Sequence, residues 1–185
     1  MTGPTITVAR KSGAAAALKR IVGLGKLAAY VGIPSSTSRD RSAQLLSMAD
    51  NVKSKRKKAR LKKAADADAT NAELLFIFSK GSPLRKQKAR PVLEPAVEAD
   101  GNRQAIGREL AGAAKASIIG DRAKALKQTK RAALAGQNAA RRWFTDPRNN
   151  WAPNTPSTIK AKGSARPGID TGAMRAAIIG VVNEE

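Results

Sequence analysis

The chain has 185 residues and a formal net charge of +21, with 35 lysines and arginines against 14 aspartates and glutamates. It contains neither cysteine nor histidine, which excludes disulfides, thiolate and histidine metal sites, and the catalytic triads built on those residues. Its length fits a single domain, and no segment approaches the ~18 apolar residues of a membrane span.

The sequence predicts a thin hydrophobic core. Apolar residues make up 42 % of the chain, but 36 residues are alanines. Valine, isoleucine, leucine and phenylalanine together fall just below the ~20 % that, at high net charge, marks chains with little core of their own. Self-repulsion at this charge also disfavours a lone compact monomer. We therefore expect the fold to depend partly on neighbouring molecules.

The first predicted elements are two strands and a helix. Residues 5–8 alternate as a short strand, and Ser12 is placed to cap a helix from Gly13 to about Leu24. Leu27 to Ile33 predicts a second strand. No acidic residue occurs before Asp40, a composition shared with organellar transit peptides. We favour the structural interpretation, because the helix gives this segment a place in the fold.

A block of basic residues follows. Eight of the eleven residues from 53 to 63 are cations and none is acidic: Lys53, Lys55, Arg56, Lys57, Lys58, Arg60, Lys62 and Lys63. Such a block is usually a solvated or disordered arm, but residues 59–69 have high helix propensity, so a partner could order them. Its charge suits nucleic-acid phosphates or an acidic protein surface. No aromatic residue is interleaved, so contact with nucleic acid would be independent of base sequence.

Residues 74–78 are the most apolar run of the chain. Their sequence is Leu-Leu-Phe-Ile-Phe, and Gly81-Ser82-Pro83 follows closely. A short run rich in aromatic residues predicts a buried strand. Paired with residues 27–33, it would form a β-hairpin in which residues 35–70 make up an extended basic arm.

Two main helices are predicted next. Pro91 opens the first, which continues past a weak point at Gly101 to about Ile119. Asp121 caps the second, which Asp146-Pro147 ends. The second helix has an apolar face formed by Leu126, Ala133, Ala140 and Phe144. The opposite face holds Lys124, Lys127, Lys130, Arg131 and Arg141.

The C-terminal part holds shorter elements. Thr155 and Pro156 suit the cap and first position of a short helix that ends near Gly163. Residues 173–177 predict a further turn of helix, and residues 178–182 a last strand. This order predicts an α+β fold in one domain spanning residues 1–185: a small antiparallel or mixed sheet with two main helices packed on it, plus the long basic arm.

Candidate catalytic motifs are weak. Asp170-Thr171-Gly172 resembles the aspartic-protease signature, in which two carboxylates share a proton. Asp170 has a simpler role available, since a carboxylate just before residues 173–177 can accept backbone N–H bonds. Residues 23–26 resemble a phosphate loop, but they lack its upstream glycine and the Ser or Thr after the lysine.

No catalytic, cofactor-binding or metal-binding residue is therefore assigned, and we expect a protein that is not an enzyme. The two tryptophans, Trp143 and Trp151, are expected to anchor packing rather than to stack on bases. The only candidate contact residues are the eight cations of the basic block.

Several ordered segments resemble a known family. They are Tyr30-Val31-Gly32-Ile33-Pro34, residues 71–77, Gly81-Ser82-Pro83, residues 89–95, residues 153–159, Lys162-Gly163-Ser164 and residues 166–172. Their order and spacing resemble the small neck and tail-completion proteins of tailed bacteriophages, including the virion-morphogenesis family. The resemblance covers roughly residues 27–34 and 71–182. The chain departs from the family pattern at Ser79-Lys80, Val92 and Gly168.

The resemblance implies a structural virion protein. Family members form rings, commonly hexameric, around the DNA channel; a tail-completion or tail-terminator subunit closes the tail and joins it to the head connector. The implied partners are further copies of the chain, the head connector or stopper ring, and tail-tube proteins, with non-specific contact to genomic DNA in the channel and no membrane. The implied location is the virion neck, after assembly in the host cytoplasm. The residues leave one alternative open, a sequence-nonspecific nucleic-acid-binding protein of the packaging or nucleoid type.

Overall fold

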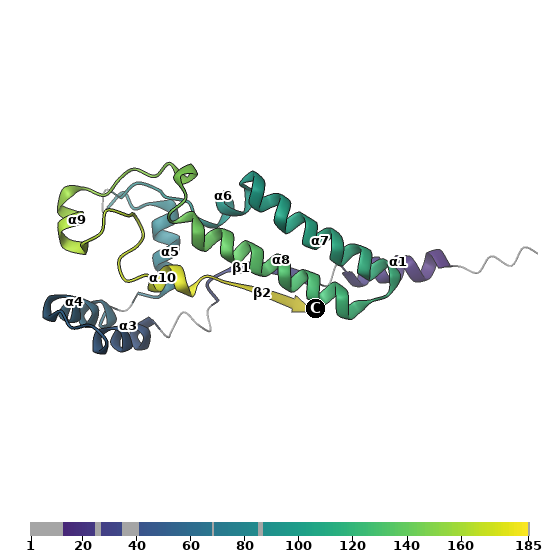
Figure 1. Cartoon of the computed structure of the whole chain (residues 1–185), viewed down its shortest axis with the longest axis horizontal. Coiled ribbons are helices and arrows are strands. Elements are labelled where there is room, and N and C mark those ends of the chain that lie inside the picture. Colours follow the sequence, from purple (N-terminus) through teal and green to yellow (C-terminus); the bar gives the residue numbers. More distant parts are fainter. Residues whose placement is uncertain (1–12, 25–26, 35–40, 68, 85–86, 185) are drawn as a thin grey trace, which may run out of the picture.

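The computed structural model describes residues 13–24, 27–34, 41–67, 69–84 and 87–184. It shows an α+β fold in which helices dominate (Figure 1). The expected strand at residues 5–8 and the cap at Ser12 lie outside the described residues. In chain order the elements are α1 (Gly13–Leu24), β1 (Leu27–Gly32), α3 (Arg41–Asp50), α4 (Lys55–Ala65), α5 (Asn71–Lys80), α6 (Leu93–Glu98), α7 (Asp100–Ile119), α8 (Arg122–Trp143), the 3-10 turn η1 (Pro147–Asn149), α9 (Pro156–Lys162), α10 (Ala173–Ala177) and β2 (Ile179–Glu184).

The two long helices α7 and α8 lie side by side (Figure 1). Gly120 ends α7 in the left-handed conformation, with φ of 88°, and the Asp121 side chain caps α8 by accepting from the Lys124 amide at 2.9 Å. These boundaries confirm the sequence prediction. The predicted apolar face of α8 is also confirmed, because Leu126 is partly buried and the other members are buried: Ala133, Ala140 and Phe144.

The sheet consists of β1 and β2, paired antiparallel with Tyr30 opposite Val181 and Val31 opposite Gly180. It packs on α8 at two close approaches. A Cβ at Gly180 would collide with the carbonyl of Ala133, and one at Gly136 would lie 2.7 Å from Val31 Cγ2. Glycines at these two positions therefore let strand and helix backbones meet almost directly.

Two polar side chains of α8 fasten this contact. Gln137 Oε1 accepts a hydrogen bond from the Gly180 amide at 2.9 Å. Arg141 donates to the carbonyls of Ile178 and Ala176, at 2.8 and 2.7 Å. Arg141 belongs to the cations predicted on the face opposite the apolar one, and its partly buried side chain ties α8 to the chain that enters β2.

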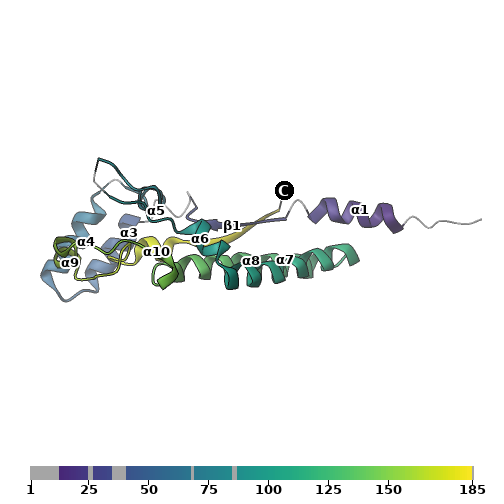
Figure 2. The same cartoon turned by 90° about the horizontal axis from the view of Figure 1, so that it is seen from above.

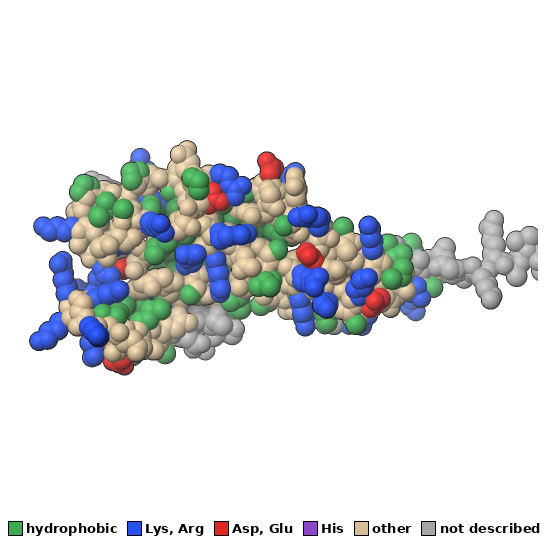
Figure 3. Space-filling model, viewed as in Figure 1, with side chains coloured by type: hydrophobic (Ala, Val, Ile, Leu, Met, Phe, Trp, Pro, Cys, Tyr) green, Lys and Arg blue, Asp and Glu red, His purple; other side chains and the backbone are tan. Residues whose placement is uncertain are grey.

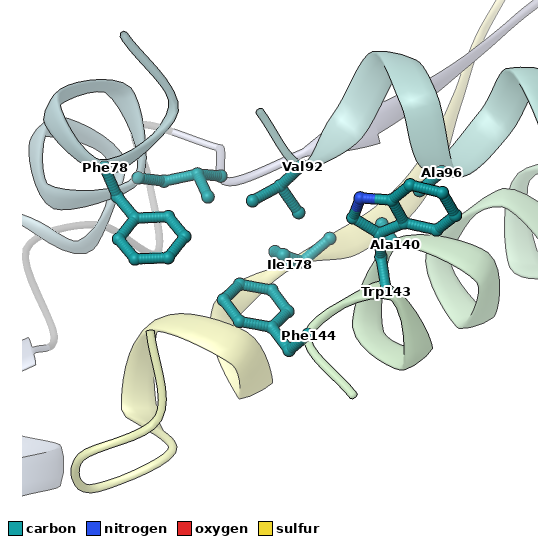
Figure 4. Close-up of a cluster of buried hydrophobic side chains, with 8 residues drawn as sticks. Phe78, Val92, Ala96, Ala140, Trp143, Phe144 and Ile178 are labelled. Atoms are coloured by element: carbon teal, nitrogen blue, oxygen red, sulfur yellow. The ribbon is translucent and has the colours of Figure 1, made fainter. Parts of the chain in front are cut away.

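An aromatic cluster closes the core at the C-terminal end of α8. Figure 4 shows Phe144 and Trp143 of this end with Phe78 from α5. Trp151 packs edge-on against Phe78 and Phe144, with ring centroids 5.2 and 5.7 Å apart. Both tryptophans are packing anchors, as expected. More than half of the buried apolar side chains in the described residues are alanines, so this cluster supplies much of the bulk of a thin core.

The predicted strand at residues 74–78 is wrong, because these residues lie within helix α5. Thr70 and Glu73 form a capping box: Thr70 Oγ1 accepts from the Glu73 amide at 3.2 Å, and Glu73 Oε2 accepts from the Thr70 amide at 2.9 Å. This pairing satisfies two amides at the helix start and commits the apolar run to a helix. The predicted hairpin with residues 27–33 is wrong for the same reason, since β1 pairs with β2.

The basic block is helical rather than extended. Residues 55–65 form α4, which packs against α3; Leu61 of α4, Leu45 of α3 and Ala173 of α10 belong to one buried apolar cluster. The Ser42 hydroxyl donates to the carbonyl of Ala65 at 2.6 Å and strengthens the α3–α4 contact. The expected arm is thus a helical hairpin held by its own apolar cluster, at least over the described residues 41–65.

The predicted first main helix is divided into α6 and α7. The break falls at Ala99, whose ψ of 128° is extended, whereas Gly101 lies inside α7. Asn102 bridges the break, because its Nδ2 donates to the Ala96 carbonyl at 2.8 Å. At the other end of α7, α1 lies against the last turn, where Arg20 Nη1 donates to the Ile118 carbonyl at 3.2 Å.

We expect Gly180→Ala to destabilise the protein by about 1–3 kcal/mol, because the added methyl must push β2 away from the backbone of α8. Gly107→Ala is the matched control. Gly107 lies within α7 with open space around it, so the same change there should raise stability by roughly 0.5–1 kcal/mol. Urea denaturation measures the free energy of unfolding of both variants. Equal stability of Gly180→Ala and the wild type would contradict the close packing of β2 on α8.

Candidate cationic site

The first turn of α4 concentrates positive charge where a helix least favours it. Lys55, Arg56, Lys57 and Lys58 occupy this turn without an acidic residue, and the Ser54 hydroxyl caps it by accepting from the Lys57 amide at 3.4 Å. The N-terminal end of a helix dipole attracts anions and opposes cations. The charge pattern therefore works against the helix itself unless an anion is nearby.

Arg60 joins α4 to the C-terminal part of the chain. Its Nη1 donates to the Ala161 carbonyl at 2.6 Å, and its Nη2 lies 2.6 Å from the Asp170 carboxylate. Both side chains of the ion pair are partly exposed, at 31 % and 38 %, so the pair contributes at most about 1 kcal/mol. Its main effect is geometric, since it holds α4 beside α9.

Asp170 was expected to cap α10, and this expectation is wrong. The cap residue is Gly172, and the Ala173 amide donates to the Thr171 hydroxyl at 3.2 Å. Asp170 pairs with Arg60 instead. The carboxylate of the protease-like tripeptide thus neutralises one cation of the basic block.

Helix α9 forms the opposite side of the site, with the boundaries that the sequence predicted. Thr155 caps it, Pro156 is its first residue, and Gly163 ends it with φ of 73°. Lys162 is partly buried, and this burial lowers the pKa of its ammonium group. Asp170 opposes that shift, while the charges of Arg90 and Arg60 add to it.

A pocket of about 380 Å³ lies between α4 and α9. Its charged lining consists of Arg56, Lys57 and Arg60 from α4, Lys160 and Lys162 from α9, and Asp170. We call this space the α4–α9 pocket. Figure 3 shows basic side chains crowding the end of the molecule where these two helices lie opposite each other. Since Asp170 is paired with Arg60, the net charge of the lining is strongly positive.

The eight cations singled out from the sequence have different surroundings. Arg56, Lys57 and Arg60 line the pocket. Lys58 lies 3.5 Å from the Asp50 carboxylate. The remaining four are exposed and do not line it: Lys53, Lys55, Lys62 and Lys63.

Sequence reasoning missed the α9 side of the pocket. Lys160, Lys162 and Ser164 lie about a hundred residues from α4 in the chain, so no local pattern connects them with it. The sequence signal for this cationic side is that no acidic residue occurs between Asp146 and Asp170.

A second pocket, of about 800 Å³, is lined partly by Phe78, Arg90 and Lys162. Arg90 is already engaged there, since its Nη2 donates to the Ala152 carbonyl at 2.9 Å and its guanidinium lies 5.7 Å from the centre of the Phe78 ring. Burial lowers the pKa of this guanidinium. These contacts make Arg90 a packing residue of the aromatic cluster.

The described part of the chain holds no cluster of three or more acidic side chains that could bind a metal ion. None of its helices combines the length and apolar character needed to cross a bilayer. Of the phosphate-loop-like residues 23–26, Gly25 and Lys26 lie outside the described residues.

Comparisons of the chain with family models, curated proteins and solved structures found no match.

We expect Arg60→Ala to loosen α9, because it removes both the bond to the Ala161 carbonyl and the ion pair with Asp170. Hydrogen exchange of the Ile159 and Gly163 amides should become faster. Lys62→Ala removes one exposed cation from the same helix and should leave these amides unchanged. If Arg60→Ala also leaves them unchanged, Arg60 does not hold the two helices together.

Proposed function

We propose that the protein is a structural, non-enzymatic subunit that assembles with copies of itself into a ring, as a tail-completion or tail-terminator protein in the neck of a tailed phage. The observation that carries the proposal is the uncovered outer face of the sheet. The neck assignment draws on the ordered segments that resemble tail-completion proteins. The partners of such a ring are the head connector or stopper ring and the tail tube.

The sheet is incomplete by itself. It has two strands among the described residues, and an isolated pair of strands is at best marginally stable. Helix α8 covers one face through Val31 and Gly180. On the other face Tyr30 and Val181 lie opposite each other and are 50 % and 37 % exposed. A second copy can cover this face and pair with a free strand edge.

Helix α5 extends the exposed apolar surface. Figure 2 shows the sheet and α5 on one side of the molecule and α7 and α8 on the other. Phe76 of α5 is 66 % exposed. A groove of about 330 Å³ beside it is lined by Ile33, Leu75 and Leu93 among others. Burial of these side chains between copies would supply apolar contact that the alanine-rich core lacks.

The charges lie where they do not oppose such contact. Figure 3 shows many basic side chains over α7 and α8 on the face turned to the viewer. The exposed cations of these two helices include Arg103, Arg108, Lys115, Lys124, Lys127, Lys130 and Arg131. Because this face is turned away from the sheet, copies that meet through their sheets keep these cations apart. The basic face remains free for DNA in the channel or for an acidic neighbour.

A second candidate function is sequence-nonspecific nucleic-acid binding. It is favoured by the α4–α9 pocket, which gathers cations from two helices with no aromatic side chain in its lining. Cations without base-stacking groups contact phosphates rather than bases.

We expect Tyr30→Asp to convert the ring to monomers, because it places a charge on the face that copies would bury. Leu134→Asp is the control, since Leu134 is an exposed apolar residue of α8, outside the sheet. Native mass spectrometry of the full chain should show one ring, of six copies on the family resemblance, for the wild type and the control. A wild-type protein that stays monomeric at all concentrations contradicts self-assembly.

The neck location has a separate test. Cryo-electron microscopy of assembled phage particles that contain this chain should place it as a ring at the head–tail junction. Its absence from that junction would overturn the neck assignment, even if the isolated chain forms rings.

A further inference from the structure

We propose that the α4–α9 pocket is a binding site for backbone phosphates of double-stranded nucleic acid. The proposal rests on the second candidate function and deepens it, because it assigns the contact to one place and to named residues. It does not depend on ring formation.

The lining of the pocket carries an excess of positive charge. Of the five cations that line the pocket, Arg60 is neutralised by Asp170 at 2.6 Å and is occupied by the Ala161 carbonyl. This leaves Arg56 and Lys57 on one side and the two lysines of α9 on the other. Phosphate oxygens bind strongly to charged donors of this kind, and each neutralised phosphate releases counterions.

The cations of the pocket are in unfavourable surroundings when no anion is bound. Arg56 and Lys57 lie in the first turn of α4, where the helix dipole disfavours cations and favours an anion. Lys162 is half-buried, and this burial is the main cause of the lowered pKa of its ammonium group; Asp170 opposes the shift, while the charges of Arg90 and Arg60 add to it. A phosphate in the pocket relieves both penalties, so the free energy of binding includes the removal of like-charge repulsion.

The donors of the pocket come from two elements that Arg60 links. Arg60 links α4 to α9 at the Ala161 carbonyl and to Asp170, so cations from two elements face the same space before the ligand arrives. Ser164 adds a neutral donor: its Oγ accepts from the Arg166 amide at 3.2 Å, which leaves the hydroxyl proton to donate to an anion. Lys57 and Lys160 at the rim are exposed, and an open rim suits a passing polymer backbone.

The experiment compares two charge-matched double variants of the full chain. Lys57→Gln with Lys160→Gln removes two cations from the pocket, and Lys62→Gln with Lys63→Gln removes two exposed cations of α4 outside it. Binding to a labelled duplex of mixed sequence is followed by fluorescence anisotropy at several salt concentrations. Equal unfolding temperatures show that both variants are folded, and Lys57→Arg with Lys160→Arg tests rescue by retained charge.

We expect the variant with Lys57→Gln and Lys160→Gln to bind the duplex at least about tenfold more weakly than the wild type. The slope of log affinity against log salt should become shallower by about 1–2, since each lost phosphate contact contributes ~0.9. The control variant should lose less than about threefold, and the arginine variant should bind like the wild type. Equal losses in the pocket and control variants would overturn the pocket assignment and leave general nucleic-acid binding intact.

Two further outcomes also contradict the proposal. If the wild type does not bind the duplex at all, both the pocket assignment and the second candidate function fail, whereas the ring proposal is untouched. If inorganic phosphate displaces the duplex at an equal concentration of phosphate groups, the pocket recognises free phosphate rather than the polymer. Retention of the duplex under that competition supports the backbone assignment.

Discussion

The close contact between α8 and the sheet determines most of the architecture. Gly180 and Gly136 allow strand and helix backbones to approach, and Gln137 and Arg141 hold them there. Because the backbones lie so close together, small side chains are enough to fill the space between helix and sheet, which suits a chain rich in alanine. Since α8 covers one face of the sheet that β1 and β2 form, the other face is exposed at Tyr30 and Val181. The incomplete sheet and the thin core are thus two consequences of one arrangement.

The second important contact is made by Arg60, which links α4 to the Ala161 carbonyl of α9 and to Asp170. It is weak as a source of stability, yet it decides where the cations of α4 lie relative to those of α9. Helix α4 is also held by its apolar contact with α3. Part of the basic block faces a second set of lysines across the pocket. The apolar sheet face and the cationic pocket are therefore separate surfaces; we propose the first for contact between copies of the chain and the second for a polyanion.

Local signals predicted the elements that local chemistry decides. The sequence correctly predicts Asp121 as a cap, Thr155-Pro156 as a helix start and Gly163 as a helix end, because each satisfies helix-end groups within a few residues. The strand prediction for residues 74–78 is wrong because a short apolar run fits strand and helix alike, and the Thr70–Glu73 capping box decides for the helix. The partner of β1 and the α9 side of the pocket were beyond local reading, since both depend on contacts between residues far apart in the chain.

The central claim is that the uncovered face of the sheet joins one copy to the next. Hydrogen exchange of the β1 and β2 amides, measured on the full chain across a range of protein concentrations, tests it directly. The account predicts that protection of these amides rises with concentration, while protection of α4 does not. Protection of the strands that is the same in dilute and concentrated protein would contradict it.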